Sequence, residues 1–138
     1  MKRIIVALCA VTVIAAAVFG TRAASAQNRS VLAKVDITDV PTKEAYIISF
    51  TVPPAPPNPN PNPNAGRHSH PGDEFIYLIE GTFTFEVEGE APVTIKAGET
   101  LRLPAGKNHR GSNPGTIPAK MISFGLFQKG VPDTVPAR

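Results

Sequence analysis

The chain of 138 residues is predicted to be an all-β protein built as a single barrel or sandwich. Two observations lead to this prediction. Short segments of alternating or β-branched residues are separated by glycine and proline, as is typical of strands joined by turns. Beyond residue 26, no stretch repeats its apolar residues with the 3.6-residue period of an amphipathic helix.

Residues 1–26 are predicted to be a secretory signal peptide that is not part of the fold. Lys2-Arg3 precede an apolar run from Ile4 to Phe19, and Ala24-Ser25-Ala26 forms an A-x-A cleavage site. The run of about 16 residues is shorter than the roughly 20 that a membrane-spanning helix needs. We therefore expect a periplasmic or secreted protein, residues 27–138, with no membrane partner after cleavage.

The charge of this expected mature chain is balanced. Lys2, Arg3 and Arg22 lie in the signal segment, so the 14 basic residues fall to 11, which equals the 11 acidic residues. Because the chain has no cluster of basic residues, we expect no nucleic-acid partner. The single cysteine, Cys9, is also in the signal segment, which excludes disulfides and thiol chemistry after export.

Alternation and turn residues predict the strands in order along one domain, residues 27–138. The predicted strands are Val31–Ile37, Ala45–Val52, Phe75–Leu78, Thr82–Glu88, Val93–Lys96, Leu101–Leu103 and Lys120–Phe127. The apolar run Phe75–Leu78 predicts a strand that is buried on both sides. Phe83, Phe85, Met121 and Phe124 are expected in the core and not as substrate contacts.

A run of prolines and asparagines from Pro53 to Asn64 separates the second and third predicted strands. Because proline removes backbone donors, the run cannot form a helix or a central strand and is expected to be an exposed, polyproline-like loop. One interpretation is a lid or docking segment beside the next motif. The other, which we favour, is a loop lengthened by repeat expansion without a function of its own.

The chain has three histidines, and their spacing predicts a metal site. In an extended chain, His68 and His70 share a face, and Glu74 has the same parity. His109 is the one histidine left to complete the set. Three neutral imidazoles and one carboxylate suit a divalent transition-metal ion, such as Mn, Fe, Ni, Cu or Zn, better than calcium or magnesium. A six-coordinate ion would keep two open positions.

The residues around these ligands resemble the two motifs of the cupin superfamily, and the likeness covers about residues 45–127. His68, His70, Glu74 and Gly81 match the first motif, His-x-His, three residues, Glu, six residues and Gly. The second motif, Gly, five residues, Pro-x-Gly, two residues, His, three residues and Asn, is matched throughout. Its matching residues are Gly98, Pro104, Gly106, His109 and Asn113.

The chain departs from the first motif at one position, where Asn62 replaces a glycine six residues before His68. Sixteen residues separate Gly81 from Gly98, which resembles a compact bacterial single-domain cupin. The resemblance implies a jelly-roll β-barrel, a homodimer formed through strand edges, and the ligand set His68, His70, Glu74 and His109. Asn113 is expected to cap a loop by hydrogen bonds.

The predicted function is an exported metal-dependent enzyme, dioxygenase-like, that acts on a small enol, phenol or diketone-like substrate. The resemblance to some cupin dioxygenases implies that Glu74 doubles as the catalytic proton acceptor. Arg67, Tyr77 and Arg110 neighbour the ligands in sequence and are candidates to contact an anionic substrate. Two alternatives stay open, a cupin-type sugar or uronate isomerase or lyase, and a barrel that binds a small molecule or metal without turnover.

Overall fold

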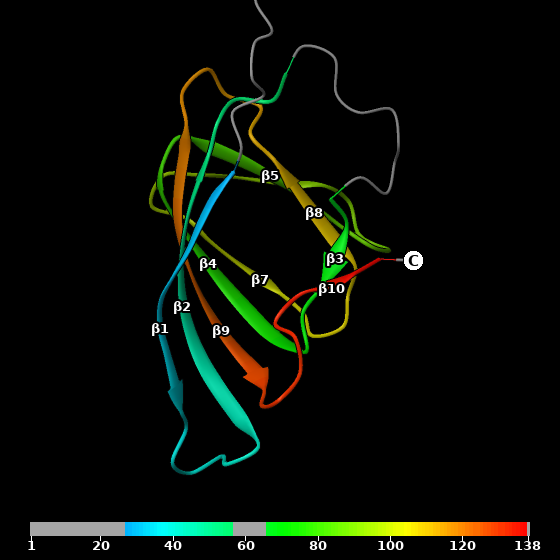
Figure 1. Cartoon of the computed structure of the whole chain (residues 1–138). Helices are drawn as coiled ribbons and strands as arrows, with labels where there is room; N and C mark the ends of the chain where they lie inside the picture. Colours follow the sequence, from blue (N-terminus) through cyan, green and yellow to red (C-terminus); the bar gives the residue numbers. More distant parts are fainter. Residues whose placement is uncertain (1–26, 57–65, 138) are drawn as a thin grey trace, which may run out of the picture.

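The computed structural model describes residues 27–56 and 66–137, and these residues form two five-stranded antiparallel sheets (Figure 1). The predicted signal peptide and most of the proline-asparagine run lie outside the described residues. Within the described ranges, no helix is long and apolar enough to cross a membrane. The all-β prediction is confirmed.

The first sheet, sheet A, is the larger of the two. In spatial order its strands are β1 (Asn28–Asp36), β2 (Lys43–Val52), β9 (Ala119–Gln128), β4 (Gly72–Glu80) and β7 (Thr100–Leu103). Strands distant in sequence therefore lie side by side, because β9 is inserted between β2 and β4.

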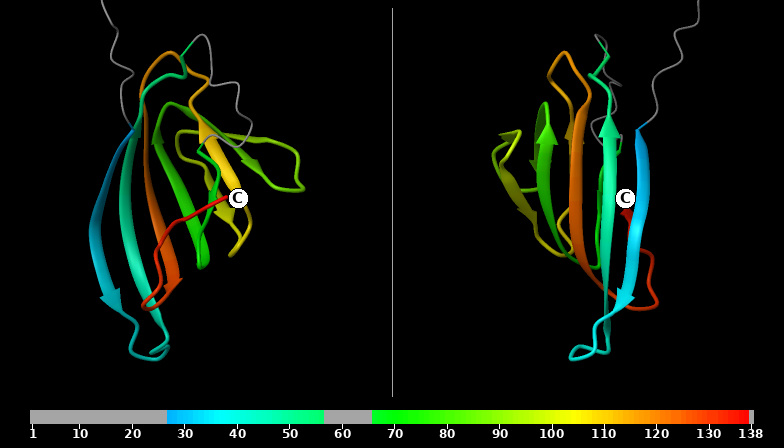
Figure 2. Two further views of the ribbon diagram at one scale, coloured as in Figure 1. Left: turned by 45° about the vertical axis from the view of Figure 1, so that its right-hand side comes forward. Right: turned by 90° about the vertical axis from the view of Figure 1, so that its left-hand side faces the viewer.

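The second sheet, sheet B, carries the shorter strands. Its spatial order is β10 (Val135–Pro136), β3 (His68–Ser69), β8 (His109–Ser112), β5 (Thr82–Val87) and β6 (Val93–Lys96). Figure 2 shows the two sheets as the opposite walls of a flattened barrel, which is the expected jelly-roll arrangement.

The core fills the space between the sheets, because alternate residues of each strand point inward. Leu78 and Met121 of sheet A meet Phe83, Phe85 and Ile95 of sheet B in one buried cluster. Three of these side chains, Phe83, Phe85 and Met121, were predicted from the sequence to be in the core. A smaller cluster of Tyr46, Ile48 and Phe127 fills the end of the barrel near the β1–β2 turn.

The prediction that Phe75–Leu78 is buried on both sides is wrong. Ile76 and Leu78 are buried, but Phe75 and Tyr77 are 45% and 48% exposed. Phe124, predicted to be core, lies beside Phe75 in the register and is 42% exposed. The reason is that sheet B covers the inner face of sheet A alone, and no helix in the described ranges covers the outer face.

Candidate metal centre

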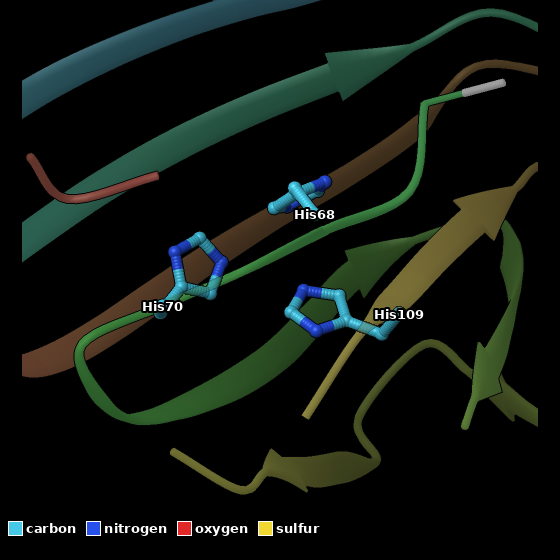
Figure 3. A group of neighbouring side chains, drawn as sticks. All are labelled: His68, His70 and His109. Atoms are coloured by element: carbon cyan, nitrogen blue, oxygen red, sulfur yellow. The ribbon is translucent and has the colours of Figure 1, made fainter. Parts of the chain in front are cut away.

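Two strands of sheet B bring the three histidines together. His68 on β3 lies directly opposite His109 on β8, and His70 follows β3 at the start of the bend into β4. Figure 3 shows the three rings gathered between these segments. Their centroids are 4.5 to 5.0 Å apart, and one nitrogen from each ring lies within 4.8 Å of the others. This group could hold a metal ion.

The bend between the ligands is anchored to the second motif. The carbonyl of His70 accepts a hydrogen bond from the N–H of Gly106, at 2.9 Å. Gly106 has a φ of 71°, which glycine adopts without the cost that other residues incur. The Pro104–Gly106 turn thereby ties the segment of His70 to the segment that leads into His109.

Main-chain carbonyls orient all three imidazoles in the same way. Nδ1 of His68 donates to the carbonyl of Gly66 at 2.9 Å, and Nδ1 of His109 donates to that of Lys107 at 3.0 Å. Nδ1 of His70 donates to the carbonyl of Asp133. Because a carbonyl can only accept, each Nδ1 carries a proton, and each Nε2 is the nitrogen that can bind a metal.

Glu74 lies beside this cluster on the inner face of sheet A and is 3% exposed. Its Oε2 is 3.1 Å from Nε2 of His70. Its Oε1 is buried without a hydrogen-bond partner among the described residues, which is costly for a carboxylate oxygen. An orphaned carboxylate oxygen beside three imidazole nitrogens is the donor set that a divalent transition ion takes, so the residues fit such an ion.

The electrostatics differ among the site residues. Burial lowers the pKa of His109 to about 4, so this imidazole is neutral near pH 7. Burial also opposes charge on His70 and on Glu74, but their hydrogen bond and mutual attraction outweigh it. The pKa of His70 is therefore raised and that of Glu74 is lowered. Without a metal, the pair holds a proton on His70 where a cation would otherwise be attracted.

The site opens into a cavity of about 230 Å³ between the sheets. The histidines and Glu74 form part of its wall, and the rest is mainly apolar. The apolar lining includes Ile76, Phe83, Phe85, Leu103 and Met121. Core residues predicted to lack substrate contact, such as Phe83, therefore also face the space that a ligand would fill.

The sequence neighbours of the ligands have separate locations. Arg110 lines the cavity and forms an ion pair with Glu86 at 2.8 Å. Arg67 also reaches Glu86, at 3.4 Å. Tyr77 points to the outer face of sheet A, so its prediction as a substrate contact is wrong. Adjacency in sequence failed here because neighbouring strand residues face opposite sides.

Other site features were either predicted or missed. Asn113 is 1% exposed and donates to the carbonyls of Val52 and Ile117 at 3.0 and 2.7 Å, as expected of a loop cap. Sequence reasoning missed Asp133, whose carbonyl holds His70, and Arg29, which forms an ion pair with the Asp133 side chain and lines the cavity. A main-chain acceptor 63 residues away leaves no signal in the sequence.

Comparison with known proteins agrees with this geometry. Residues 59–125, which contain all four predicted ligands, match the family model of the cupin domain. The chain contains a cupin domain. A segment of 57 residues is 39% identical to the tetracenomycin polyketide synthase protein TcmJ of Streptomyces glaucescens. That similarity covers 41% of this chain and 38% of TcmJ, so the chain matches well under half of that relative's length.

Solved cupin structures share the fold at low sequence identity. A double-stranded β-helix protein from Klebsiella pneumoniae superposes with a TM-score of 0.62 at 16% identity, covering 84% of this chain and 88% of that one. A cupin superfamily protein from Desulfitobacterium hafniense gives 0.57 at 16% identity, covering 75% and 80%. The DMSP lyase DddQ from Ruegeria pomeroyi gives 0.53 at 18% identity, covering 68% and 45%. The two sheets therefore form the double-stranded β-helix of cupins.

Proposed function

We propose that this cupin is an exported, metal-dependent enzyme that acts on a small organic molecule in a dioxygenase-like reaction. One observation carries the proposal: the Nε2 atoms of three histidines and an orphaned carboxylate oxygen converge on the wall of a mainly apolar cavity. In the proposal, His68, His70, His109 and Glu74 hold one divalent transition-metal ion. Export is inferred from residues 1–26 of the sequence alone.

The proposed reaction combines chemistry of the ion with chemistry of the protein. An ion held by four protein ligands supplies open positions for a carbonyl or enol oxygen and for dioxygen. Glu74 supplies the base, because its lowered pKa keeps it ionised and its Oε1 has no partner among the described residues. It accepts the proton of a substrate hydroxyl. The apolar walls exclude water from the reacting groups.

The cavity limits the class of substrate. A volume of about 230 Å³ admits a small molecule, and its apolar walls favour a compound whose few oxygen atoms face the histidines. An enol, phenol or diketone-like compound has this character. The similarity to a protein named as part of a polyketide synthase supports the same choice, because polyketides carry carbonyl and enol oxygens on a carbon chain.

Metal analysis and oxygen uptake test the proposal together. We expect the full chain, expressed in an exporting bacterium and purified without chelators, to contain about one equivalent of a redox-active metal and to consume oxygen with enol or diketone substrates. His109→Ala should remove most of the metal while the sheets stay folded by circular dichroism. A metal content that His109→Ala does not change would rule out this site.

Glu74→Gln tests the base against a matched control. Glu44→Gln removes another buried carboxylate, which bonds Tyr46 outside the cavity, and should leave oxygen uptake unchanged. Reconstituted Glu74→Gln with a full complement of metal should lose 10²-fold or more of kcat, in the range of a general base. Turnover of a sugar or uronate without oxygen would favour the isomerase or lyase alternative. Tight binding without any turnover would favour the non-catalytic barrel.

A further inference from the structure

The outer face of sheet A carries a group of exposed apolar side chains. We define the outer patch as Ile47, Phe75, Tyr77, Ile122 and Phe124, which are 36–48% exposed. They lie on β2, β9 and β4, three strands that pair with one another in the middle of the sheet. Ile47, Phe124 and Phe75 form one row across the strands, and Ile122 and Tyr77 lie side by side in the next row. The patch is therefore continuous.

The size of the patch matches the centre of a protein interface. With aromatic side chains of 150–250 Å² each, residues exposed to this degree present on the order of 400 Å² of apolar surface. A standard interface takes about 800 Å² from each partner and has an apolar core inside a polar rim. The outer patch is about half of that area, which leaves the remainder for the rim.

The rim has the charge pattern that a second copy of the chain would complement. At one end of the patch, Arg102 binds Asp73 at 2.9 Å. At the other end, Lys120 binds Glu80 at 2.6 Å. Each end therefore carries both signs of charge in balance, and neither end selects a strongly acidic or basic partner. An identical surface, turned by a two-fold rotation, offers each ion pair an equally balanced rim.

We propose that two copies of this chain pack their outer patches against each other to form a face-to-face homodimer. This arrangement differs from pairing through strand edges, which would use the free edge of β1 and leave the outer patch exposed. The metal centre and the cavity lie on the inner side of the same sheet, so both cavities stay open in the dimer. The exposed faces of Phe75 and Tyr77 are explained by this contact.

A charged substitution in the outer patch tests the proposal. We expect the full-length protein to sediment as a dimer in analytical ultracentrifugation at micromolar concentration. Ile122→Glu places two carboxylates in the dry centre of the interface and should raise the dissociation constant by about 100-fold or more. Ile117→Glu is the matched control, because Ile117 is 48% exposed but lies outside sheet A. It should remain dimeric.

Further measurements keep the outcome decisive. Tyr77→Glu, on the neighbouring strand, should also give a monomer with an unchanged circular dichroism spectrum, so a folding defect in one variant does not decide the test. A monomeric parent protein, or a folded dimer in either patch variant, overturns the proposal. So does a dimer that resists both patch substitutions but is lost in Val35→Pro, because that result assigns the contact to the edge of β1.

Discussion

At the scale of single residues, the main feature is that backbone carbonyls orient every imidazole. The acceptors are the carbonyls of Gly66, Lys107 and Asp133. A carbonyl keeps its position when side chains nearby change, so the tautomer of each ligand is fixed by the fold. The proton of His70 is the exception to a ready-made site, because Nε2 of His70 shares it with Glu74 in the metal-free protein.

Metal binding is expected to release a proton from His70. The pKa of His70 is raised above 6.5, so at pH 6.5 this imidazole is more than half protonated without metal. His109, with a pKa of about 4, has already lost its proton there. Binding must therefore release between half a proton and one proton, and affinity should fall as the pH drops below the pKa of His70.

Calorimetric titration with Zn²⁺ at pH 6.5, in buffers of different ionisation enthalpy, measures this release. Glu74→Gln removes the carboxylate that raises the pKa of His70, so its release should be smaller than that of the parent protein. A buffer-independent enthalpy in the parent would show that the proton is not on His70.

At the scale of elements, the end of the chain supports the ligand strand. β3 has two residues, and its ladder to β8 consists of the single pair His68 and His109. On its other side, β10 pairs with both residues of β3, and the N–H of Ala137 donates to Arg67 at 3.0 Å. The short strand that carries His68 is thus held mainly by a segment 66 or more residues later in the sequence.

Deleting residues 131–138 is expected to weaken metal binding by about 10-fold or more, the size of effect seen when groups that orient metal ligands are removed. The sheets should persist, because neither core cluster contains a residue of this segment. Competition with a coloured chelator measures the affinity.

Asp133→Ala is the matched control for this deletion. It removes the ion pair with Arg29 but keeps the carbonyl that binds His70, so it should bind metal as the parent protein does. A deletion variant with parental affinity would show that β10 does not position the ligands.

At the scale of the whole molecule, the sheets and the site depend on close backbone contact between β4 and β9. Gly72 starts β4 between His70 and Glu74, and a Cβ there would lie 1.9 Å from the carbonyl oxygen of Leu126. Nothing flexible can move aside, because the obstacle is backbone. The glycine therefore lets the ligand-bearing bend dock against the sheet.

Gly72→Ala is expected to lower the free energy of unfolding by about 3 kcal/mol or more, as other severe steric substitutions do. Gly98→Ala is the control, because its φ of 90° strains alanine while no neighbour lies within 4 Å of the added Cβ. It should cost only about 1 to 2 kcal/mol. Urea unfolding of the metal-free proteins measures both, and equal losses would refute the steric explanation.

Local sequence determined much of the fold. The alternation in residues 82–88 and 93–96 predicted β5 and β6, because a strand with one buried face must repeat every two residues. Glycines at positions 81 and 98 marked turns that have φ of 85° and 90°. Motif spacing likewise selected the three histidines that the fold gathers, because the i and i+2 residues of a strand share a face.

Only the tertiary structure decided which surfaces are covered and what lies behind each ligand. Periodicity shows that Phe75 and Ile76 face opposite sides, but it cannot show that one of those sides has no second layer. Nor could it show that the carbonyl of Asp133 would orient His70, since a backbone acceptor is present at every residue. The sequence by itself determined the ligands and the strands, and long-range packing decided their surroundings, because it depends on which distant segments meet.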